Sequence, residues 1–232
     1  MSNDALGCVV LSGASSGIGR AIAQHLLSTG WNVLGLDIAA PAIEHSAYRH
    51  ETLDLTDRAA VETLLQSVDA QAFVHAAGIL RVGKLGQLDI QGGEQMWQLH
   101  VQAAAVMGNA LLPRMIHNKR GRLVFIGSRV SQGFPGRGQY AATKSALVAM
   151  AKSWAAEVAS MGVTVNVVSP AATETSMLND PQRAGSQPRL PPIGRLIQPQ
   201  EVADLVAYLL SPSASAITGQ EITICGGSSL HH

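Results

Sequence analysis

The 232-residue chain has few aromatic residues, only two cysteines and no excess charge of either sign. Lysine plus arginine and aspartate plus glutamate number 16 each, which leaves no cationic surplus to hold a nucleic acid or an anionic membrane. Cys8 and Cys225 stand in short apolar runs, where a free cysteine behaves as a small apolar residue, so we expect no disulfide. No apolar run reaches the roughly 18 residues of a membrane span, and the N-terminus is unlike a signal peptide. We therefore expect a cytoplasmic protein.

Short apolar runs rich in Val, Ile and Leu alternate with longer segments of helical spacing. Such near-continuous apolar runs are typical of a parallel sheet that is covered on both faces. The clearest of them are CVVLSG, NVLGLD, QAFVHAAG, RLVFIGS, TVNVVSP and EITICGG. The alternation predicts one domain over residues 1–232, of the α/β class: a doubly wound (Rossmann-type) parallel sheet of about seven strands with helices on both faces.

Element boundaries follow from the same spacing. Helices are expected over residues 17–28, 93–117, 139–160 and 200–210, and strands over 6–11, 32–37, about 50–55 and 122–128. The connection between the second and third strands has room for one or two helical turns at most. Pro113 should kink its helix or remove one backbone hydrogen bond. The proline-rich stretch 176–198 predicts a long functional loop.

A glycine-rich turn, SGASSGIG at residues 12–19, follows the first predicted strand and opens a helix. Gly13, Gly17 and Gly19 allow the backbone to turn tightly and to approach a pyrophosphate at the helix N-terminus. A glycine cluster alone is a weak signal, because it also occurs in ordinary tight turns. Its position in the first strand–turn–helix unit of an alternating chain favours dinucleotide binding.

Asp37 ends the second predicted strand about 20 residues beyond the glycines. A carboxylate there accepts hydrogen bonds from the adenosine ribose hydroxyls and repels a 2′-phosphate, which favours NAD over NADP. The alternative is that Asp37 only caps the next turn. Ser16 and Ile38 support the NAD interpretation, because neither offers a cation to an extra phosphate.

Tyr140 and Lys144 lie one turn apart at the start of a predicted helix, so their side chains share a face. A lysine ammonium and an oxidised nicotinamide nearby would both favour the tyrosine phenolate. Ser128 ends a predicted strand at the sheet edge where such folds bind ligands, and its hydroxyl could hydrogen-bond a substrate oxygen. Taken singly, Tyr140 and Lys144 are equally consistent with an exposed helical pair. Their combination with the glycine turn and Ser128 favours a catalytic site.

In order and over nearly the whole chain, these motifs resemble those of the short-chain dehydrogenase/reductase family. Residues 12–19 are similar to its T-G-x-x-x-G-x-G with serine for threonine, residues 75–78 (HAAG) to its N-N-A-G, and residues 140–144 to its Y-x-x-x-K. The resemblance implies an NAD-dependent oxidoreductase that moves a hydride between a nicotinamide and a secondary alcohol or carbonyl substrate. It implies that Tyr140 is the general acid/base, that Ser128 orients the carbonyl oxygen, and that Lys144 holds the nicotinamide ribose and lowers the pKa of the tyrosine.

The resemblance also implies a wider cofactor site. Asp54 and Leu55 would flank the adenine, Pro170 would begin a turn in which Ala171 replaces the usual glycine, and Thr175 would hydrogen-bond the carboxamide. The cofactor-binding residues expected are Gly13, Ser15, Ser16, Gly17, Ile18, Gly19, Asp37, Asp54, Leu55, Ala76, Ala77, Gly78, Tyr140, Lys144, Pro170, Thr173 and Thr175. No metal is expected.

His100 departs from the family pattern, which has an asparagine in the helix before the serine strand. Because that asparagine helps to hold a water for proton relay, we count His100 among the catalytic candidates, as a hydrogen-bonding or titrating relay. The alternative, given equal weight, is a helix histidine satisfied by backbone groups. His75 is expected only to pack beside the cofactor or to satisfy backbone.

The loop 176–198 is expected to cover the nicotinamide as a lid, with Met177 and Leu178 as apolar walls. Arg81, Arg129 and Arg137 weakly indicate an anionic or hydroxyl-rich substrate, although loop arginines are more often only solvated.

Two other functions compete with this interpretation. Sugar-nucleotide epimerases share the tyrosine and lysine, but the glycine spacing differs and too little chain follows Lys144 for their substrate domain. A non-catalytic nucleotide-sensing or scaffolding protein on the same fold is the other alternative, which His100 keeps open. The family resemblance further implies a homotetramer through helices 93–117 and 139–160 and the last strand, with the alanines at 103–105 permitting close helix approach.

Overall fold

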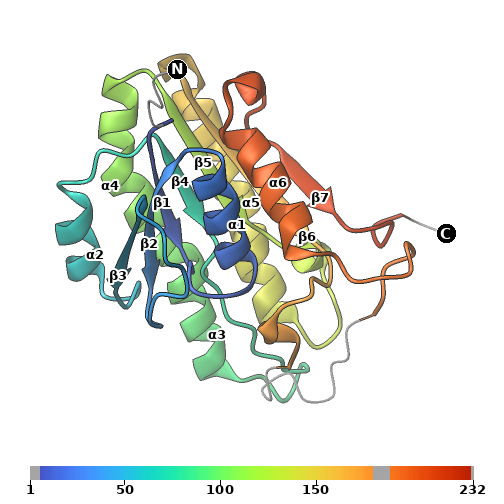
Figure 1. Ribbon diagram of the computed structural model, residues 1–232. Helices are drawn as coiled ribbons and strands as arrows, with labels where there is room; N and C mark the ends of the chain where they lie inside the picture. The colour runs from blue at the N-terminus through green and yellow to red at the C-terminus, as the bar shows by residue number, and fades with distance from the viewer. Residues whose placement is uncertain (1–5, 180–188, 231–232) are drawn as a thin grey trace.

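The structure, a computed structural model, describes residues 6–179 and 189–230. Its centre is one seven-stranded sheet in the order β3-β2-β1-β4-β5-β6-β7, in which every pairing is parallel (Figure 1). The strands are β1 (Cys8–Ser12), β2 (Asn32–Asp37), β3 (Tyr48–Thr52), β4 (Ala72–His75), β5 (Gly121–Ile126), β6 (Val163–Pro170) and β7 (Glu221–Ile224). The predicted doubly wound sheet is confirmed.

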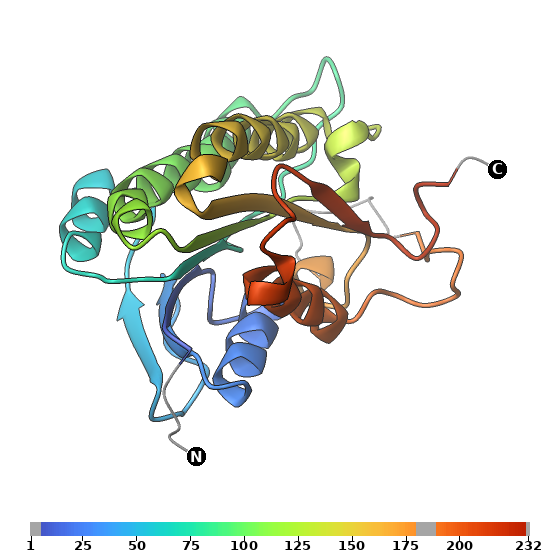
Figure 2. The same cartoon turned by 90° about the horizontal axis from the view of Figure 1, so that it is seen from above.

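Helices cover both faces of the sheet, as Figure 2 shows from above. One face carries α1 (Gly17–Ser28) and α6 (Pro199–Leu210), which pack against each other. The other carries α2 (Arg58–Leu65), α4 (Ala103–His117) and α5 (Gly138–Val158). Each layer encloses its own apolar core, because the buried strands β1, β4 and β5 send alternate residues to opposite faces.

Several boundaries differ from those expected. The helix expected over 93–117 begins earlier, as α3 (Ile90–Trp97), and one turn of π-helix, η1 (Gln98–Gln102), separates it from α4. Helix α4 continues through Pro113. The third strand lies two to three residues earlier than predicted, and the connection before it, residues 38–47, forms no helix.

Helix α2 was not foreseen in the sequence. Its signals are present but short: Asp57 caps the helix by accepting from the backbone N–H of Ala60 at 3.1 Å, and Val61 and Leu65 are its buried residues. A helix of two turns with one apolar stripe is stabilised by packing against α4 in the core rather than by its own sequence.

The order of strands creates a crevice at one edge of the sheet. From β1 the chain winds outward through β2 and β3, then crosses to β4 on the opposite side of β1. The connections therefore diverge at the carboxyl ends of β1 and β4, which is where ligands bind in sheets of this kind.

No helix in the ranges 6–179 and 189–230 is long and apolar enough to cross a bilayer.

Candidate active site

A cavity of about 540 Å³ lies at the carboxyl edge of the sheet. It is bounded by the glycine turn after β1, the ends of β2, β4, β5 and β6, the start of α5 and both described ends of segment 176–198. Among the residues expected at the site, those that line it are Gly13, Ser16, Gly17, Ile18, Gly19, Asp37, Leu55, Ala76, Ala77, Gly78, Ser128, Tyr140, Lys144, Pro170, Thr173 and Thr175. The fold thus brings three widely separated motifs to one place.

Three of the expected site residues, Ser15, Asp54 and His100, do not line the cavity. Ser15 is a buried member of the glycine turn, and its hydroxyl donates to the carbonyl of Ala39 at 3.4 Å. Asp54 is exposed, and its carboxylate accepts from the N–H and the hydroxyl of Thr56 at 2.9 and 2.8 Å. His100 is buried beneath the cavity floor, and its ring nitrogens are engaged by the protein, as described below.

The glycine turn is held in a conformation that side chains could not adopt. Gly13 has φ +72°, and a Cβ on it would lie 2.7 Å from the backbone nitrogen of Ala77. A Cβ on Gly19 would overlap the carbonyl oxygen of Gly13. The N-terminus of α1, at Gly17, has no side-chain cap and faces the cavity. Unpaired N–H groups at a helix start attract anions.

Asp37 lies at the same end of the cavity, and its carboxylate is engaged twice by the backbone. One oxygen accepts from the N–H of Ser15 at 2.9 Å and the other from the N–H of Ala39 at 3.0 Å. The turn-capping role considered as an alternative is therefore real. It does not exclude a ligand role, because each carboxylate oxygen has a second lone pair and Asp37 still lines the cavity.

Ser128, Tyr140 and Lys144 line the cavity where β5 ends and α5 begins. Strand β5 ends at Ile126, two residues before Ser128, whose hydroxyl accepts from the N–H of Val130 at 3.2 Å. Lys144 is buried and donates to the carbonyl of Ile126 at 2.9 Å. Burial lowers the pKa of Lys144 to about 8, and its Nζ lies 5.8 Å from the centroid of the Tyr140 ring.

His75 occupies the base of the crevice as part of a closed hydrogen-bond network. The Ser12 hydroxyl accepts from the N–H groups of Ala76 and Ala77, so its own hydrogen is directed to Nδ1 of His75 at 2.8 Å. Nε2 of His75 then donates to the carbonyl of Leu99 at 3.1 Å. Burial is the main reason that the pKa of His75 falls to about 3, so the imidazole is neutral.

His100 is held just as completely, inside the π-helical turn. Its Nε2 accepts from the N–H of Ile79 at 3.0 Å, and its Nδ1 donates to the hydroxyl of Thr143 at 2.8 Å. Thr143 passes its hydrogen to the carbonyl of Tyr140 at 2.9 Å. Burial, followed by the charge of Lys144, lowers the pKa of His100 well below its ordinary value. Both nitrogens therefore have protein partners, one a backbone N–H and the other the side chain of Thr143.

Sequence reasoning missed two contributors to this site. Thr143 stands between Tyr140 and Lys144 in the chain and three residues after the tyrosine, a spacing that already puts it one helical turn away. The carbonyl of Ile126 that receives Lys144 had no sequence signal, because any residue type carries a carbonyl.

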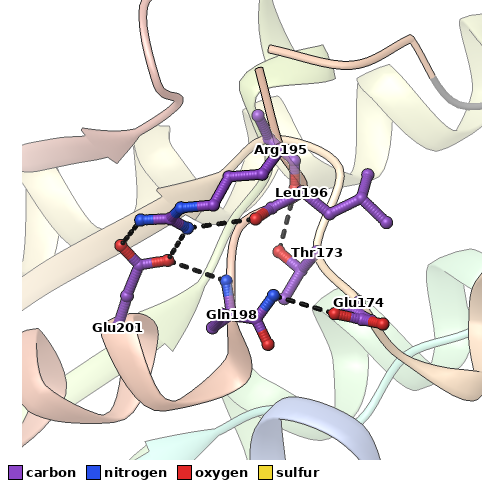
Figure 3. Close-up of polar contacts among 7 residues, drawn as sticks. Thr173, Glu174, Arg195, Leu196, Gln198 and Glu201 are labelled. Carbon is purple, nitrogen blue, oxygen red and sulfur yellow. Dashed lines mark hydrogen bonds and ion pairs between the residues drawn. The ribbon is translucent and has the colours of Figure 1, made fainter. Parts of the chain in front are cut away.

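The two ends of segment 176–198 are joined by hydrogen bonds between residues 172–174 and 197–198, which we call the neck. Figure 3 shows part of it. Ile197 donates to the carbonyl of Ala172 at 3.0 Å and accepts from the N–H of Glu174 at 2.9 Å. Gln198 donates to Glu174 at 2.8 Å, and Arg195 donates two hydrogen bonds of 2.7 and 2.9 Å to Glu201 of α6. The hydrogen bonds from Arg195 are the main reason that the pKa of Glu201 falls to about 2. Residues 180–188 of the predicted lid lie outside the described residues.

Fold and cavity together define a dinucleotide-binding α/β protein with a serine, tyrosine and lysine at one end of its cleft. Residues 13–229 match the family described as enoyl-(acyl carrier protein) reductase. The chain belongs to the short-chain dehydrogenase/reductase family of oxidoreductases, which bind a nicotinamide cofactor.

Curated relatives and solved structures agree with that assignment. The chain is 36% identical over 233 residues to the 3-oxoacyl-(acyl-carrier-protein) reductase of Salmonella typhimurium, covering 94% of this chain and 95% of the relative. It is 33% identical over 234 residues to an uncharacterized oxidoreductase of Bacillus subtilis, covering 94% and 97%. The ligand-free aldohexose dehydrogenase of Thermoplasma acidophilum superposes with a TM-score of 0.89 at 28% identity, covering 97% of this chain and 94% of that one.

Because His75 is buried in its neutral form, we expect the free energy of unfolding to fall in weak acid. Its pKa is about 3 in the folded chain and about 6.5 when unfolded. Between these values the unfolded state binds the extra proton, so the free energy of unfolding should fall as pH falls from 6.5, by up to about 1.4 kcal/mol per pH unit. In His75→Asn the slope between pH 6.5 and pH 5, measured by urea unfolding, should be shallower.

The exposed His117 provides the matched control. His117→Asn should keep the slope of the parent chain. Equal slopes in the parent and in His75→Asn would mean that His75 is protonated in the folded protein.

Proposed function

We propose that the chain is an NAD-dependent dehydrogenase/reductase acting on a secondary alcohol or its carbonyl. The observation that carries the proposal is the convergence of Ser128, Tyr140 and Lys144 on the same cavity as the glycine turn and Asp37. Each group alone has an ordinary structural explanation. Their assembly from separate elements at a single sheet edge is what a reaction between a nucleotide and a small substrate requires.

The residues at the Asp37 end fit a dinucleotide. The open N-terminus of α1 would receive the pyrophosphate, and the turn around Gly13 leaves no side chain in its way. The carboxylate of Asp37 would receive the adenosine ribose hydroxyls, with Leu55 beside the base. Lys144 would hold the nicotinamide ribose, and Thr175 would receive the carboxamide. When bound, the nicotinamide supplies or accepts the hydride.

The chain itself moves the proton and orients the substrate. Tyr140 exchanges a proton with the substrate oxygen, while the Ser128 hydroxyl donates a hydrogen bond to the same oxygen. The ammonium of Lys144, 5.8 Å from the tyrosine ring, favours the phenolate form that accepts a proton during alcohol oxidation. The hydrogen bond from Lys144 to the carbonyl of Ile126 keeps this charge in place.

His100 acts in this proposal as a positioning residue for Tyr140. Through Thr143 it holds the first turn of α5, and its ring meets the Tyr140 ring edge to face with centroids 5.7 Å apart. Its other nitrogen ties down the loop after β4 at Ile79. The same imidazole therefore connects the cofactor-side loop to the catalytic helix, and it does so in its neutral form.

Segment 176–198 would act as a lid on a fixed neck. Met177, Leu178 and Leu190 line the cavity from its two described ends. The hydrogen bonds of Ile197 to Ala172 and Glu174 hold the two ends of the segment together, and the Arg195–Glu201 pair fixes its C-terminal end to α6.

Assembly as a homotetramer is also proposed. Within the described residues, strand β7 pairs with β6 alone and forms a half-buried edge of the sheet, which a second copy could cover. The long helices α4 and α5 lie side by side on one face of the sheet (Figure 2). The chain is proposed to have no nucleic acid or membrane partner and to work in the cytoplasm.

Tyr140→Phe tests the chemical role. The variant should bind NADH like the parent, measured by nicotinamide fluorescence, because the ring stays in place. Its turnover on a carbonyl panel should fall by about 10²- to 10⁴-fold, the usual contribution of a general acid/base. Undiminished turnover would remove Tyr140 from the mechanism. If neither NADH nor NADPH binds the parent, a scaffolding function replaces the oxidoreductase proposal.

Asp37→Ser tests the cofactor preference. The parent should bind NADH more tightly than NADPH, because a carboxylate repels the 2′-phosphate. The variant should lose affinity for NADH and gain affinity for NADPH, so that the ratio of the two dissociation constants moves by about tenfold or more. A parent that prefers NADPH would overturn the choice of NAD.

His100→Asn separates positioning from proton relay. If His100 only positions Tyr140, the variant and the parent should have the same pH–rate profile, while kcat falls and the KM for NADH is unchanged. A profile that loses one ionisation in the variant would instead establish a titrating relay. His117→Asn should leave both kcat and the profile as they are.

A further inference from the structure

The charged side chains that line the cavity are separated by sign. Of the described lining residues, Asp37 is the one carboxylate, and it stands at the end of β2. The cationic lining residues are Arg129, Arg137, Lys144 and Arg189. Arg129, Arg137 and Lys144 belong to the other end, beyond β1 and β4 in the sheet order, where Ser128 and Tyr140 lie. The end that holds the reacting groups is therefore the cationic one.

Two of these arginines are fixed next to the catalytic residues by the chain itself. Arg129 directly follows Ser128, and Arg137 occupies the N-cap position of α5, whose first turn carries Tyr140. The loop between them is tied down, because the N–H of Gly83 donates to the carbonyl of Gly136 at 2.9 Å. Both arginines are half-buried, so their charges act at a wall of the cavity and not in open solvent.

Phe134 joins the two arginines. The guanidinium carbon of Arg129 lies 6.0 Å, and that of Arg137 5.0 Å, from the centroid of the Phe134 ring. A ring that attracts two cations keeps them in one region despite their mutual repulsion. An anion placed there would relieve that repulsion and would receive planar, two-pronged hydrogen bonds.

Arg129 retains hydrogen-bonding capacity for such an anion. Its guanidinium makes one hydrogen bond within the described residues, a long one of 3.5 Å to the carbonyl of Ser228, another lining residue. No described carboxylate lies within ion-pair distance of the Arg129 guanidinium. An arginine fork next to a catalytic serine, with a weak acceptor only, suits a charged ligand.

Apolar side chains also line the cavity, among them Leu80, Val130, Phe134, Met177, Leu178 and Leu190. These side chains suit a compact carbon skeleton, and a dinucleotide would already take up much of a cavity of about 540 Å³.

We propose that the substrate is a small hydroxy or oxo acid whose carboxylate is bound by Arg129 and Arg137 beside Phe134, with its reacting carbon at Ser128 and Tyr140. The proposal rests on the proposed oxidoreductase function and names its substrate class. In the oxidative direction the carbinol C–H bond breaks and its hydride passes to NAD⁺. The hydroxyl proton passes to Tyr140 and a C=O bond forms. The carboxylate is unchanged, and Arg129 and Arg137 are specificity-determining residues.

The first experiment compares 3-oxocyclohexanecarboxylate with its methyl ester as substrates with NADH. The parent should favour the acid in kcat/KM by about 10- to 100-fold, the range expected for hydrogen bonds to a charged group. Arg129→Gln should bring the two values together by lowering that of the acid alone. Arg58→Gln, on the exposed face of α2, is the matched control and should keep the preference of the parent.

Two further variants, Arg129→Lys and Arg137→Gln, keep the proposal testable if Arg129→Gln does not fold. The lysine keeps the charge but not the fork, so its preference for the acid should be intermediate. An acid-to-ester ratio near one in the parent, or a ratio unchanged in both Arg129→Gln and Arg137→Gln, would overturn the proposal.

A binding measurement tests for the carboxylate site even if no substrate is turned over. With NAD⁺ present, 3-hydroxybenzoate should raise the melting temperature of the parent more than 3-hydroxybenzamide does, and this difference should vanish in Arg129→Gln. Equal shifts would reject the carboxylate site. A kcat/KM for the N-acetylcysteamine thioester of 3-oxobutanoate far above that of the acid would also reject it, in favour of a thioester substrate. Loss of NADH binding, by contrast, would reject the oxidoreductase function itself.

Discussion

The carboxyl edge of the sheet, where the connections from β1 and β4 diverge, is the constraint on which the site depends. A parallel sheet that is wound in both directions from β1 must leave a crevice there, because no connection can cover both sides. The crevice stays narrow because the glycine turn is packed against the loop after β4, with Gly13 close to the backbone of Ala77. Ser12 and His75 then hydrogen-bond across the bottom of it.

Beneath that crevice, two neutral histidines make hydrogen bonds where a protein core usually has apolar side chains. His75 and His100 hold neighbouring carbonyl and N–H groups of the π-helical turn and of the loop after β4. A π-turn leaves irregular backbone groups that need partners, and such turns are frequent at functional sites. Here the partners are imidazoles whose burial disfavours protonation, so the floor of the cavity carries little charge. Lys144 is then the main charge beside Tyr140.

The cavity wall has the opposite character. Asp37 lines one end of the cavity, and Arg129 and Arg137 line the other end, near Tyr140. The two ends therefore differ in charge, as the proposed nucleotide and substrate sites require. Arg129, Phe134 and Arg137 owe their effect to a loop of a few residues between β5 and α5. Such loops vary without changing the sheet, so the scaffold of this family can serve different substrates with the same reacting groups.

Much of this architecture could be predicted from the sequence. Apolar strands of four to eight residues, separated by segments of helical periodicity, can be recognised in the sequence because a sheet buried on both faces needs them. The motifs at 12–19 and 140–144 can also be recognised, because each consists of residues close together in the chain. Short elements could not be predicted from the sequence. Helix α2 has only one apolar stripe. The π-helical turn at His100 resembles uninterrupted helix in the sequence, because its side chains keep the helical pattern.

The sequence by itself therefore determined the fold class and indicated the candidate reacting residues, since both depend on local spacing along the chain. Only the tertiary structure decided what surrounds them. It brought Ile79, His100, Thr143 and Tyr140 into one chain of contacts, although up to 43 residues separate the hydrogen-bonding partners. It also left Ser15 and Asp54 outside the cavity wall and gathered Arg129 and Arg137 around one ring. Contacts between distant segments depend on how the helices and loops pack on the sheet, and that packing has no signature in spacing along the chain.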